Sequence, residues 1–178
     1  MTQTPPATEA MLRVDHAGEH GAVAIYRGQR AVFGALPHKA RMAALLEEME
    51  EGEQHHLAEF DRLLTERRVR PTALGPLWQA AGWTLGAATA LMGERAAMAC
   101  TSAVESVIEG HYADQADALD AAGEAPDLAR TFRAFREDEI GHHDTAIAEG
   151  AEDAPGYGLM RRVIRAGCLA AIKITEKV

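Results

Sequence analysis

The segments Glu53-Gln-His-His56 and Glu139-Ile-Gly-His142 decide the fold, because they repeat one Glu-x-x-His step within a single chain. Each step follows a lone glutamate, Glu19 or Glu105, by the same interval of 34 residues. One accidental Glu-x-x-His pair is expected in a chain this rich in glutamate. Two pairs with a shared interval are better explained by duplication.

The repeat extends beyond these six residues. At the same offset of 86 residues, Tyr26 and Gln29 recur as Tyr112 and Gln115. Self-similarity over such a length is typical of a duplicated structural unit. We therefore expect two copies of one helical hairpin.

The composition favours helices over strands. The chain has 178 residues, of which 47% are hydrophobic but only 5% aromatic, and alanine is abundant. Such a chain can close a core without disulfides, and its small side chains suit closely packed helices better than a sheet. We expect a single all-α domain, residues 1–178.

The first hairpin is predicted from apolar spacing and from its breakers. A helix of about Thr8 to Phe33 is followed by a second of about His38 to Arg67, with the connection centred on Leu36. Leu36 is also the midpoint between Glu19 and Glu53. Because a helix rises 1.5 Å per residue, both glutamates are expected at the same height on antiparallel neighbours.

The second hairpin follows the same rule. Glu105 and Glu139 are symmetric about Ala122, at the break that runs through Gly123 to Pro126. A glutamate and a histidine three residues apart share one helix face, so both can reach one metal. This is the ligand arrangement of ferritin-like four-helix bundles. We expect hairpins at 1–67 and 94–150, an apolar crossover at 68–93 and an extra C-terminal helix at 154–178.

The charge balance supports a metal site and argues against nucleic acid. The formal net charge is −9, whereas a phosphate-binding surface needs excess Lys and Arg. Four carboxylates gathered in a core would repel one another unless cations neutralised them, and two divalent ions balance four carboxylates. Carboxylate-rich ligation with only two imidazoles suits iron or manganese better than zinc or copper, and iron is our first choice.

Other polar residues are predicted to surround the ligands. Tyr26 and Tyr112 lie two helical turns beyond Glu19 and Glu105, either as buried tyrosines or as groups that move protons or electrons or touch substrate. Asp15 and Asp138 are candidates to orient a ligand imidazole. The remaining histidines near these levels are expected to support the ligands or to be core or surface residues: His16, His20, His55, His111 and His143.

The stretch Val69 to Gly93 leaves three alternatives open. No charged residue occurs from Pro71 to Gly93, a length that could just span a bilayer, but prolines and glycines interrupt it. Trp78 and Trp83 suit a headgroup boundary. We prefer contact with the membrane interface over ordinary core packing and over a span.

The last element, Ala154 to Val178, reads as an amphipathic cationic helix. It either caps the bundle or contacts anionic lipid headgroups. Its basic residues are Arg161, Arg162, Arg165, Lys173 and Lys177.

Cys100 and Cys168 have neither disulfide-type nor zinc-type spacing, so a reducing compartment is expected. Met1 to Ala10 shows neither a signal-peptide nor a transit-peptide pattern. No Gly-x-Gly-x-x-Gly run occurs, so a built-in dinucleotide domain is not expected.

Several further segments carry a family resemblance. They are Arg13-Val-Asp-His-Ala-Gly-Glu19, Ile25-Tyr26 with Gly28-Gln29, Arg70-Pro-Thr with Pro76-Leu-Trp78, Ala97-Met-Ala-Cys100-Thr101, Ala103-Val-Glu105, His111-Tyr112, Phe135-Arg136, His142-His143-Asp144 and Ala166-Gly-Cys168. With these, the chain resembles the demethoxyubiquinone hydroxylases, ferritin-like di-iron monooxygenases of ubiquinone biosynthesis, over nearly its whole length. His20 departs from the aromatic residue expected at that position.

The resemblance implies that six residues bind two iron ions: Glu19, Glu53, His56, Glu105, Glu139 and His142. It implies insertion of one oxygen atom from O2 into the ring of a polyprenyl methoxy-methyl-benzoquinol. Three sources of the electrons stay open: a reductase, a nicotinamide nucleotide such as NADH that docks directly, and the reduced substrate itself. It also implies a peripheral place on the cytoplasmic side of the inner membrane, among other ubiquinone-biosynthesis proteins. The alternative function is that of a ferritin-type ferroxidase or iron-storage protein.

Overall fold

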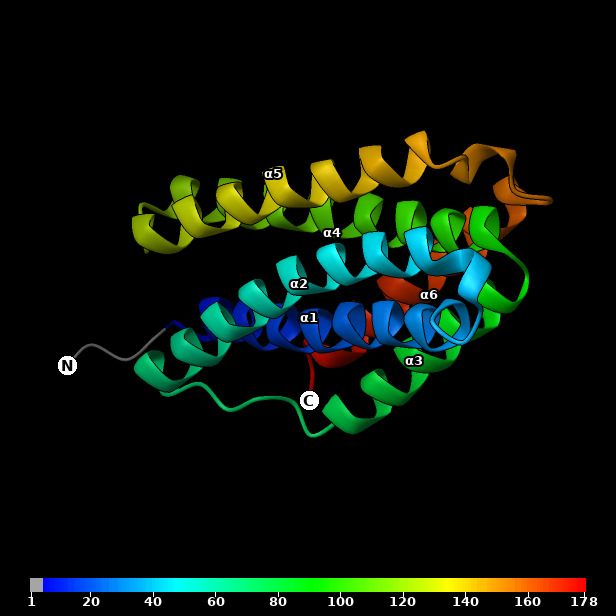
Figure 1. The fold of residues 1–178 in the computed structure, drawn as a ribbon. Coiled ribbons are helices and arrows are strands. Elements are labelled where there is room, and N and C mark those ends of the chain that lie inside the picture. The colour runs from blue at the N-terminus through cyan, green and yellow to red at the C-terminus, as the bar shows by residue number, and fades with distance from the viewer. Residues whose placement is uncertain (1–4) are drawn as a thin grey trace. The chain divides into compact units, whose positions relative to one another are not determined.

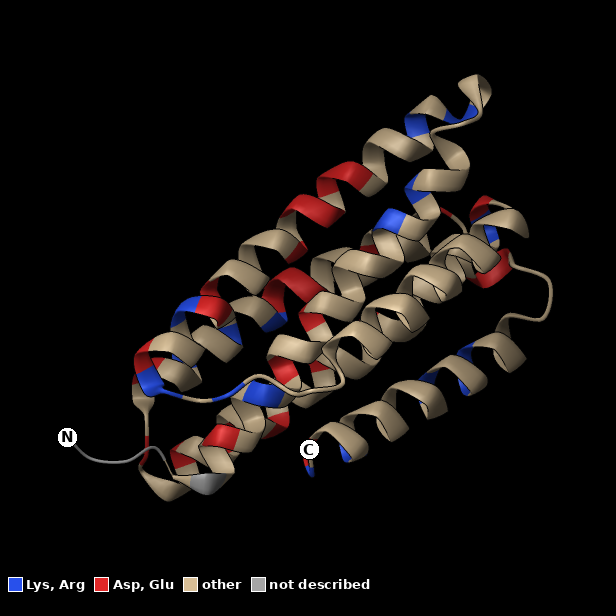
Figure 2. Ribbon diagram, turned by 90° about the horizontal axis from the view of Figure 1, so that it is seen from below, with Lys and Arg blue, Asp and Glu red and all other residues tan. Residues whose placement is uncertain are grey.

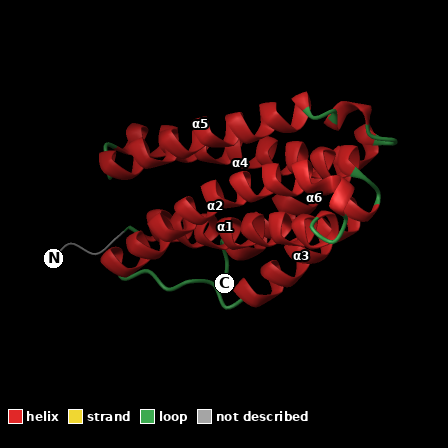
Figure 3. Ribbon diagram, viewed as in Figure 1, coloured by secondary structure: helices red, strands yellow, loops and turns green. Residues whose placement is uncertain are grey.

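The computed structural model describes residues 5–178, and this part of the chain is all-α, with no strand (Figures 1 and 3). The α-helices are α1 (Pro6–Phe33), α2 (Ala40–Arg67), α3 (Gly75–Leu91), α4 (Glu94–Ala122), α5 (Pro126–Ala148) and α6 (Tyr157–Thr175), with 3-10 helices η1 (Pro37–Lys39) and η2 (Ala151–Asp153). The predicted all-α class with two repeated hairpins, α1–α2 and α4–α5, is confirmed. The part of the targeting-signal prediction that concerns residues 1–4 lies outside the described residues.

The chain divides into two compact units. The first comprises the described residues up to Glu94 together with Leu169–Val178, and the second is Arg95–Cys168. The unit boundary follows the duplication, because each unit contains one of the two hairpins. Helix α6 begins in the second unit and ends in the first.

Helix ends differ from the predicted ones by a few residues, for local reasons. Helix α1 begins at Pro6, two residues early, because proline is well suited to the first helical turn. The chain after Leu36 forms η1 before α2 starts at Ala40. The last helix starts at Tyr157 instead of Ala154, because η2 and a left-handed Gly156 (φ 75°) precede it.

In the first unit, α2 returns antiparallel along α1, and α3 packs on α1 through glycines (Figure 1). A Cβ added at Gly82 would lie 2.6 Å from the Gly21 carbonyl oxygen, and one added at Gly86 would overlap the Ile25 carbonyl oxygen. On the α1 side, a Cβ at Gly28 would overlap the backbone of Trp83. The two helices therefore meet backbone to backbone, which only glycine permits at these positions.

In the second unit, α4 and α5 are joined by aromatic packing and ion pairs. The Tyr112 ring stacks on Phe132, with centroids 5.6 Å apart, and meets Phe135 edge-on. The Arg136 guanidinium lies 3.0 Å from the Glu109 carboxylate. Ser102 and the Tyr157 hydroxyl, 3.5 Å apart, connect α4 to the start of α6.

The uncharged stretch forms a helix with two unlike faces. Gly82, Gly86 and Thr89 are buried, whereas Trp83 and Leu91 are exposed. None of the helices among residues 5–178 combines the length and apolarity needed to cross a bilayer. The inner face of α3, with Gly82, Gly86 and Thr89, therefore contributes to the core, and its outer face is exposed.

Candidate metal centre

The first hairpin brings together Glu19 from α1 with Glu53 and His56 from α2. One ligand atom from each lies within 4.8 Å of the others, and all three residues are 1–3% exposed. His56 Nδ1 is 3.8 Å from both Glu19 Oε2 and Glu53 Oε2. These distances are longer than hydrogen bonds. They approach the distances between two ligand atoms that both bind one ion about 2.0–2.2 Å away. We call this set the first triad.

The second hairpin repeats the arrangement with Glu105 from α4 and Glu139 and His142 from α5. One ligand atom from each again lies within 4.8 Å of the others. His142 Nδ1 is 3.7 Å from Glu139 Oε2, and both carboxylates are buried. We call this set the second triad. All six predicted residues are thus assembled into two triads, one in each unit.

The donor set fits iron. Each triad offers two buried carboxylates and one imidazole, without a thiolate, which favours iron or manganese over softer ions. Two buried carboxylates held this close repel each other, so a cation between them lowers the free energy of the folded state.

Residues predicted near the ligands occupy varied positions. Tyr26 and Tyr112 are both buried, each with 1% of its surface exposed. Asp15 is buried and Asp138 is exposed. It remains a prediction that the two tyrosines act on protons or substrate. It also remains a prediction that the two aspartates orient ligand imidazoles.

The remaining histidines fall into separate environments. His55 is exposed, His111 lies 2.9 Å from the amide of Gln115, and His143 lies beside Asp144. His16 and His20 meet edge to face, with ring centroids 4.6 Å apart. Burial lowers the pKa of His20 below its usual value, and the charge of His16 acts in the same direction.

Three features were not predicted from the sequence. Asp61 of α2 lies with His16 and His20 in a compact cluster. The His-x-x-x-His spacing could have suggested the pair of histidines, but not Asp61. Glu50, 2% exposed, is surrounded by Arg27, Arg30 and Gln54. No sequence signal distinguishes this glutamate from its exposed neighbours.

The third unpredicted feature concerns Cys168. Its side chain is half-buried, and its pKa is raised to about 11, first by burial and then by the negative charge of Glu105. The unusual environment of Cys168 therefore depends on a predicted metal ligand.

The chain is similar to proteins of one family over nearly all of its length. The family described as ubiquinone biosynthesis protein COQ7 matches residues 6–175. A 3-demethoxyubiquinol 3-hydroxylase of Rhodospirillum rubrum is 49% identical over 170 residues, which cover 96% of this chain and 78% of that protein. The mitochondrial NADPH-dependent 3-demethoxyubiquinone 3-hydroxylase of Rattus norvegicus is 45% identical, and the mitochondrial 5-demethoxyubiquinone hydroxylase of Saccharomyces cerevisiae 39%, with the same two coverages.

Proposed function

The chain belongs to the family of ubiquinone biosynthesis protein COQ7. We propose that it hydroxylates its quinol substrate with two iron ions, one held by each triad. It is a demethoxyubiquinol hydroxylase of ubiquinone biosynthesis. The observation that supports the metal assignment is that each hairpin places two buried carboxylates beside one imidazole.

The proposed reaction inserts one oxygen atom of O2 into the ring of a polyprenyl methoxy-methyl-benzoquinol and releases the other as water. Iron supplies the redox chemistry with O2 that protein side chains alone lack. The six ligand residues would hold the ions, one in each triad, and the burial of the four carboxylates limits the access of bulk water. Tyr26 and Tyr112 are the candidates to handle protons or to contact the ring.

The electrons for O2 must come from outside the chain's own side chains. The rat relative is named as NADPH-dependent. We assign the same class of donor, a reduced nicotinamide nucleotide such as NADPH or NADH, to this protein. Without such a donor, hydroxylation would stop after a single turnover.

Membrane association is part of the proposal because a polyprenyl tail resides in lipid. The exposed face of α3 carries Trp83 and Leu91, and α6 exposes Leu159 and Val163. Lys and Arg recur along α6, and its helical residues include no acidic side chain (Figure 2). We place the protein peripherally on the cytoplasmic side of the inner membrane, within reach of other ubiquinone-biosynthesis proteins.

The decisive experiment follows the oxygen atom. Iron-loaded protein is reduced without air and mixed with a demethoxyquinol analogue and ¹⁸O-labelled O2. We expect a hydroxylated product that carries one ¹⁸O by mass spectrometry. Label entering from H₂¹⁸O instead would contradict O2-dependent hydroxylation.

The matched variant is Glu105→Ala, with Asp114→Ala, which removes an exposed carboxylate of the same helix, as its control. We expect Glu105→Ala to remain helical but to lose about a hundredfold or more of the product, because removal of a ligand weakens one ion site. It should also fail to restore ubiquinone in cells that lack this hydroxylase. Full activity in this variant would refute the ligand assignment.

The same measurements separate this function from a ferritin-type ferroxidase. A ferroxidase would consume Fe(II) and O2 without modifying the quinol, and an iron store would assemble into a large cage. The names of the relatives favour the hydroxylase.

A further inference from the structure

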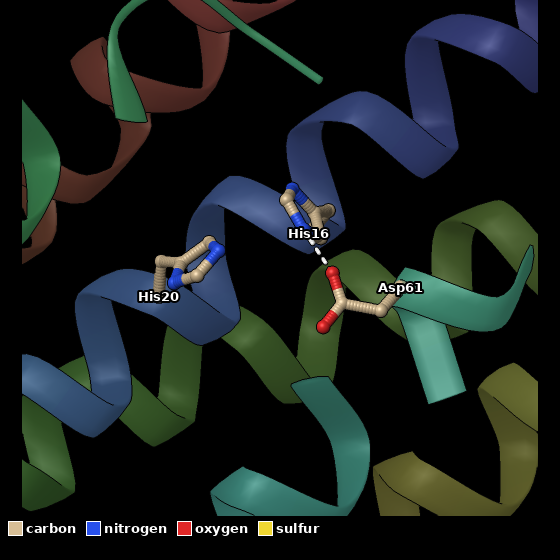
Figure 4. Close-up of side chains that lie close together, drawn as sticks. All are labelled: His16, His20 and Asp61. Carbon is tan, nitrogen blue, oxygen red and sulfur yellow. Dashed lines mark hydrogen bonds and ion pairs between the residues drawn. The ribbon is translucent and has the colours of Figure 1, made fainter. Parts of the chain in front are cut away.

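A second histidine-rich cluster lies in the first unit, outside the two triads. His16 and His20 project from successive turns of α1, and Asp61 reaches from α2 toward His16 (Figure 4). His16 Nε2 lies 2.9 Å from Asp61 Oδ1. One ligand atom from each of the three residues lies within 4.8 Å of the others.

The arrangement has the geometry of a metal site. Histidines four residues apart share one face of a helix, so their rings can approach a common ion. Their planes here are nearly perpendicular, at 89°, with centroids 4.6 Å apart. His16 is 7% exposed, His20 is partly exposed and Asp61 is exposed, so an ion can enter from solvent while its deeper ligand stays fixed.

Neighbouring groups define which atoms can act as ligands. The amide nitrogen of Gln79 in α3 lies 3.2 Å from His20 Nδ1, which leaves Nε2 as the atom of His20 available to bind a metal. With a metal on Nε2, the ring proton moves to Nδ1, and a rotated Gln79 amide accepts it through its oxygen. Such a partner on the outer nitrogen is the usual support of a metal-bound imidazole.

The donor set differs from that of the triads. Two imidazoles and a single carboxylate favour a borderline ion such as Zn²⁺, whereas two carboxylates with one imidazole favour iron. We propose that His16, His20 and Asp61 form a Zn²⁺ site that joins α1 to α2, separate from the two iron triads. Binding replaces the proton between His16 and Asp61 with the ion, and water completes the coordination.

The test counts zinc ions on the full-length protein. Metal-free wild type and His20→Phe are saturated with Zn²⁺, dialysed and analysed for bound zinc. Because the triads also take up zinc, the expected result is a difference: wild type retains one more equivalent than His20→Phe. His38→Phe removes an exposed imidazole of η1 and serves as the matched control, which should retain the wild-type number.

A second variant keeps the proposal falsifiable if His20→Phe is poorly folded. Asp61→Asn changes an exposed side chain, and it should weaken binding of the additional Zn²⁺ by about tenfold or more. X-ray absorption at the zinc edge should show higher imidazole content in wild type than in His20→Phe. Equal zinc content and affinity in wild type and both variants would overturn the proposal and leave the His16–Asp61 pair as a contact between helices. That outcome would not affect the hydroxylase assignment.

Discussion

Gly86 of α3 lies so close to the carbonyl oxygen of Ile25 in α1 that a Cβ at residue 86 would overlap it. The contact lies between two backbones, so no side-chain rotation can relieve an added methyl group. This packing fixes α3 on α1, the helix that supplies Glu19 to the first triad.

We expect Gly86→Ala to lower the free energy of unfolding. Alanine is intrinsically about 1 kcal/mol better than glycine inside a helix, but overpacking a rigid contact costs about 1–3 kcal/mol or more. The difference, a net loss of up to about 2 kcal/mol or more, should appear in urea unfolding followed by circular dichroism. Gly110→Ala is the control, because a Cβ there meets nothing within 4 Å and only the helix preference remains. A stabilised Gly86→Ala protein would contradict the close approach of α3 and α1.

We expect the buried, ion-paired carboxylate of Glu50 to make the protein less stable in acid. Its burial raises the pKa of the carboxyl, but hydrogen bonds from Arg30 and Arg27 outweigh this effect and hold the pKa below its ordinary value of 4.5. The folded state thus binds the proton more weakly than the unfolded state. The Glu50 contribution is complete above the unfolded value and is lost as pH falls through the folded one.

The measurement compares the pH dependence of unfolding in wild type and Glu50→Gln. We expect the variant to lose about 1–3 kcal/mol at pH 7, because charge-assisted hydrogen bonds disappear, and to show less further loss between about pH 5 and 3. Glu51→Gln alters an exposed carboxylate in the next position and should keep the wild-type slope. Equal slopes in wild type and Glu50→Gln would show that Glu50 is not the acid-sensitive group.

How much the sequence could predict depends on whether the chain itself sets the geometry. Glu19 and Glu53 could be paired in advance, because a fixed rise per residue and a short turn determine their relative height. Helix α3 is separated from α1 by all of α2, so the register of Gly86 against Ile25 depends on packing and not on a turn. For the same reason, the effect of Glu105 in α4 on Cys168 in α6 could not be predicted.

Metal binding should stabilise the protein, because each triad buries two carboxylates. Under anaerobic conditions, Fe(II) at about a hundredfold excess over its dissociation constant should add about 2.7 kcal/mol per independent site. For a protein of this length that corresponds to a rise of about 5–10 °C in Tm. Thermal unfolding with and without Fe(II) measures the shift.

A ligand variant should lose part of this stabilisation by Fe(II). Glu19→Gln removes one negative charge from the first triad, so the metal-free variant should be as stable as wild type or more stable. Its Fe(II)-induced rise in Tm should be smaller. An unchanged rise in this variant would remove Glu19 from the metal site.

Cys168 should react slowly with alkylating reagents in the folded protein. A pKa raised from 9.0 to about 11 lowers the thiolate fraction near neutral pH about a hundredfold. Peptide mapping after timed exposure to iodoacetamide gives the rate for this cysteine alone. Denatured protein, in which burial is lost, supplies the reference rate.

The charge of Glu105 makes the reactivity of Cys168 a probe of the second triad. Glu105→Gln should speed alkylation, because it removes a negative charge that disfavours the thiolate. Metal bound at Glu105 should act in the same direction. If neither Glu105→Gln nor bound metal alters the alkylation rate, burial alone protects the thiol.

Association with lipid should depend on both α3 and α6. Leu91 and Leu159 are 77% and 63% exposed, so their substitution by glutamine costs little in the folded protein. Each substitution removes the free energy gained when one leucine side chain enters the membrane interface, about 1–2 kcal/mol. This corresponds to roughly tenfold weaker partitioning onto vesicles. Sedimentation with vesicles of phosphatidylcholine and phosphatidylglycerol measures this loss, and Leu36→Gln, at the α1–η1 turn, is the control.

The basic residues of α6 should make the same binding sensitive to salt and to lipid charge. Each Lys or Arg near an anionic surface contributes about 1 kcal/mol, and this attraction fades over a Debye length. Arg161→Gln combined with Arg165→Gln should therefore weaken binding to vesicles that contain phosphatidylglycerol more than to neutral ones. If neither the leucine nor the arginine variants alter sedimentation, the exposed faces of α3 and α6 are not the lipid-binding surface. The quinol would then have to reach the triads by another surface.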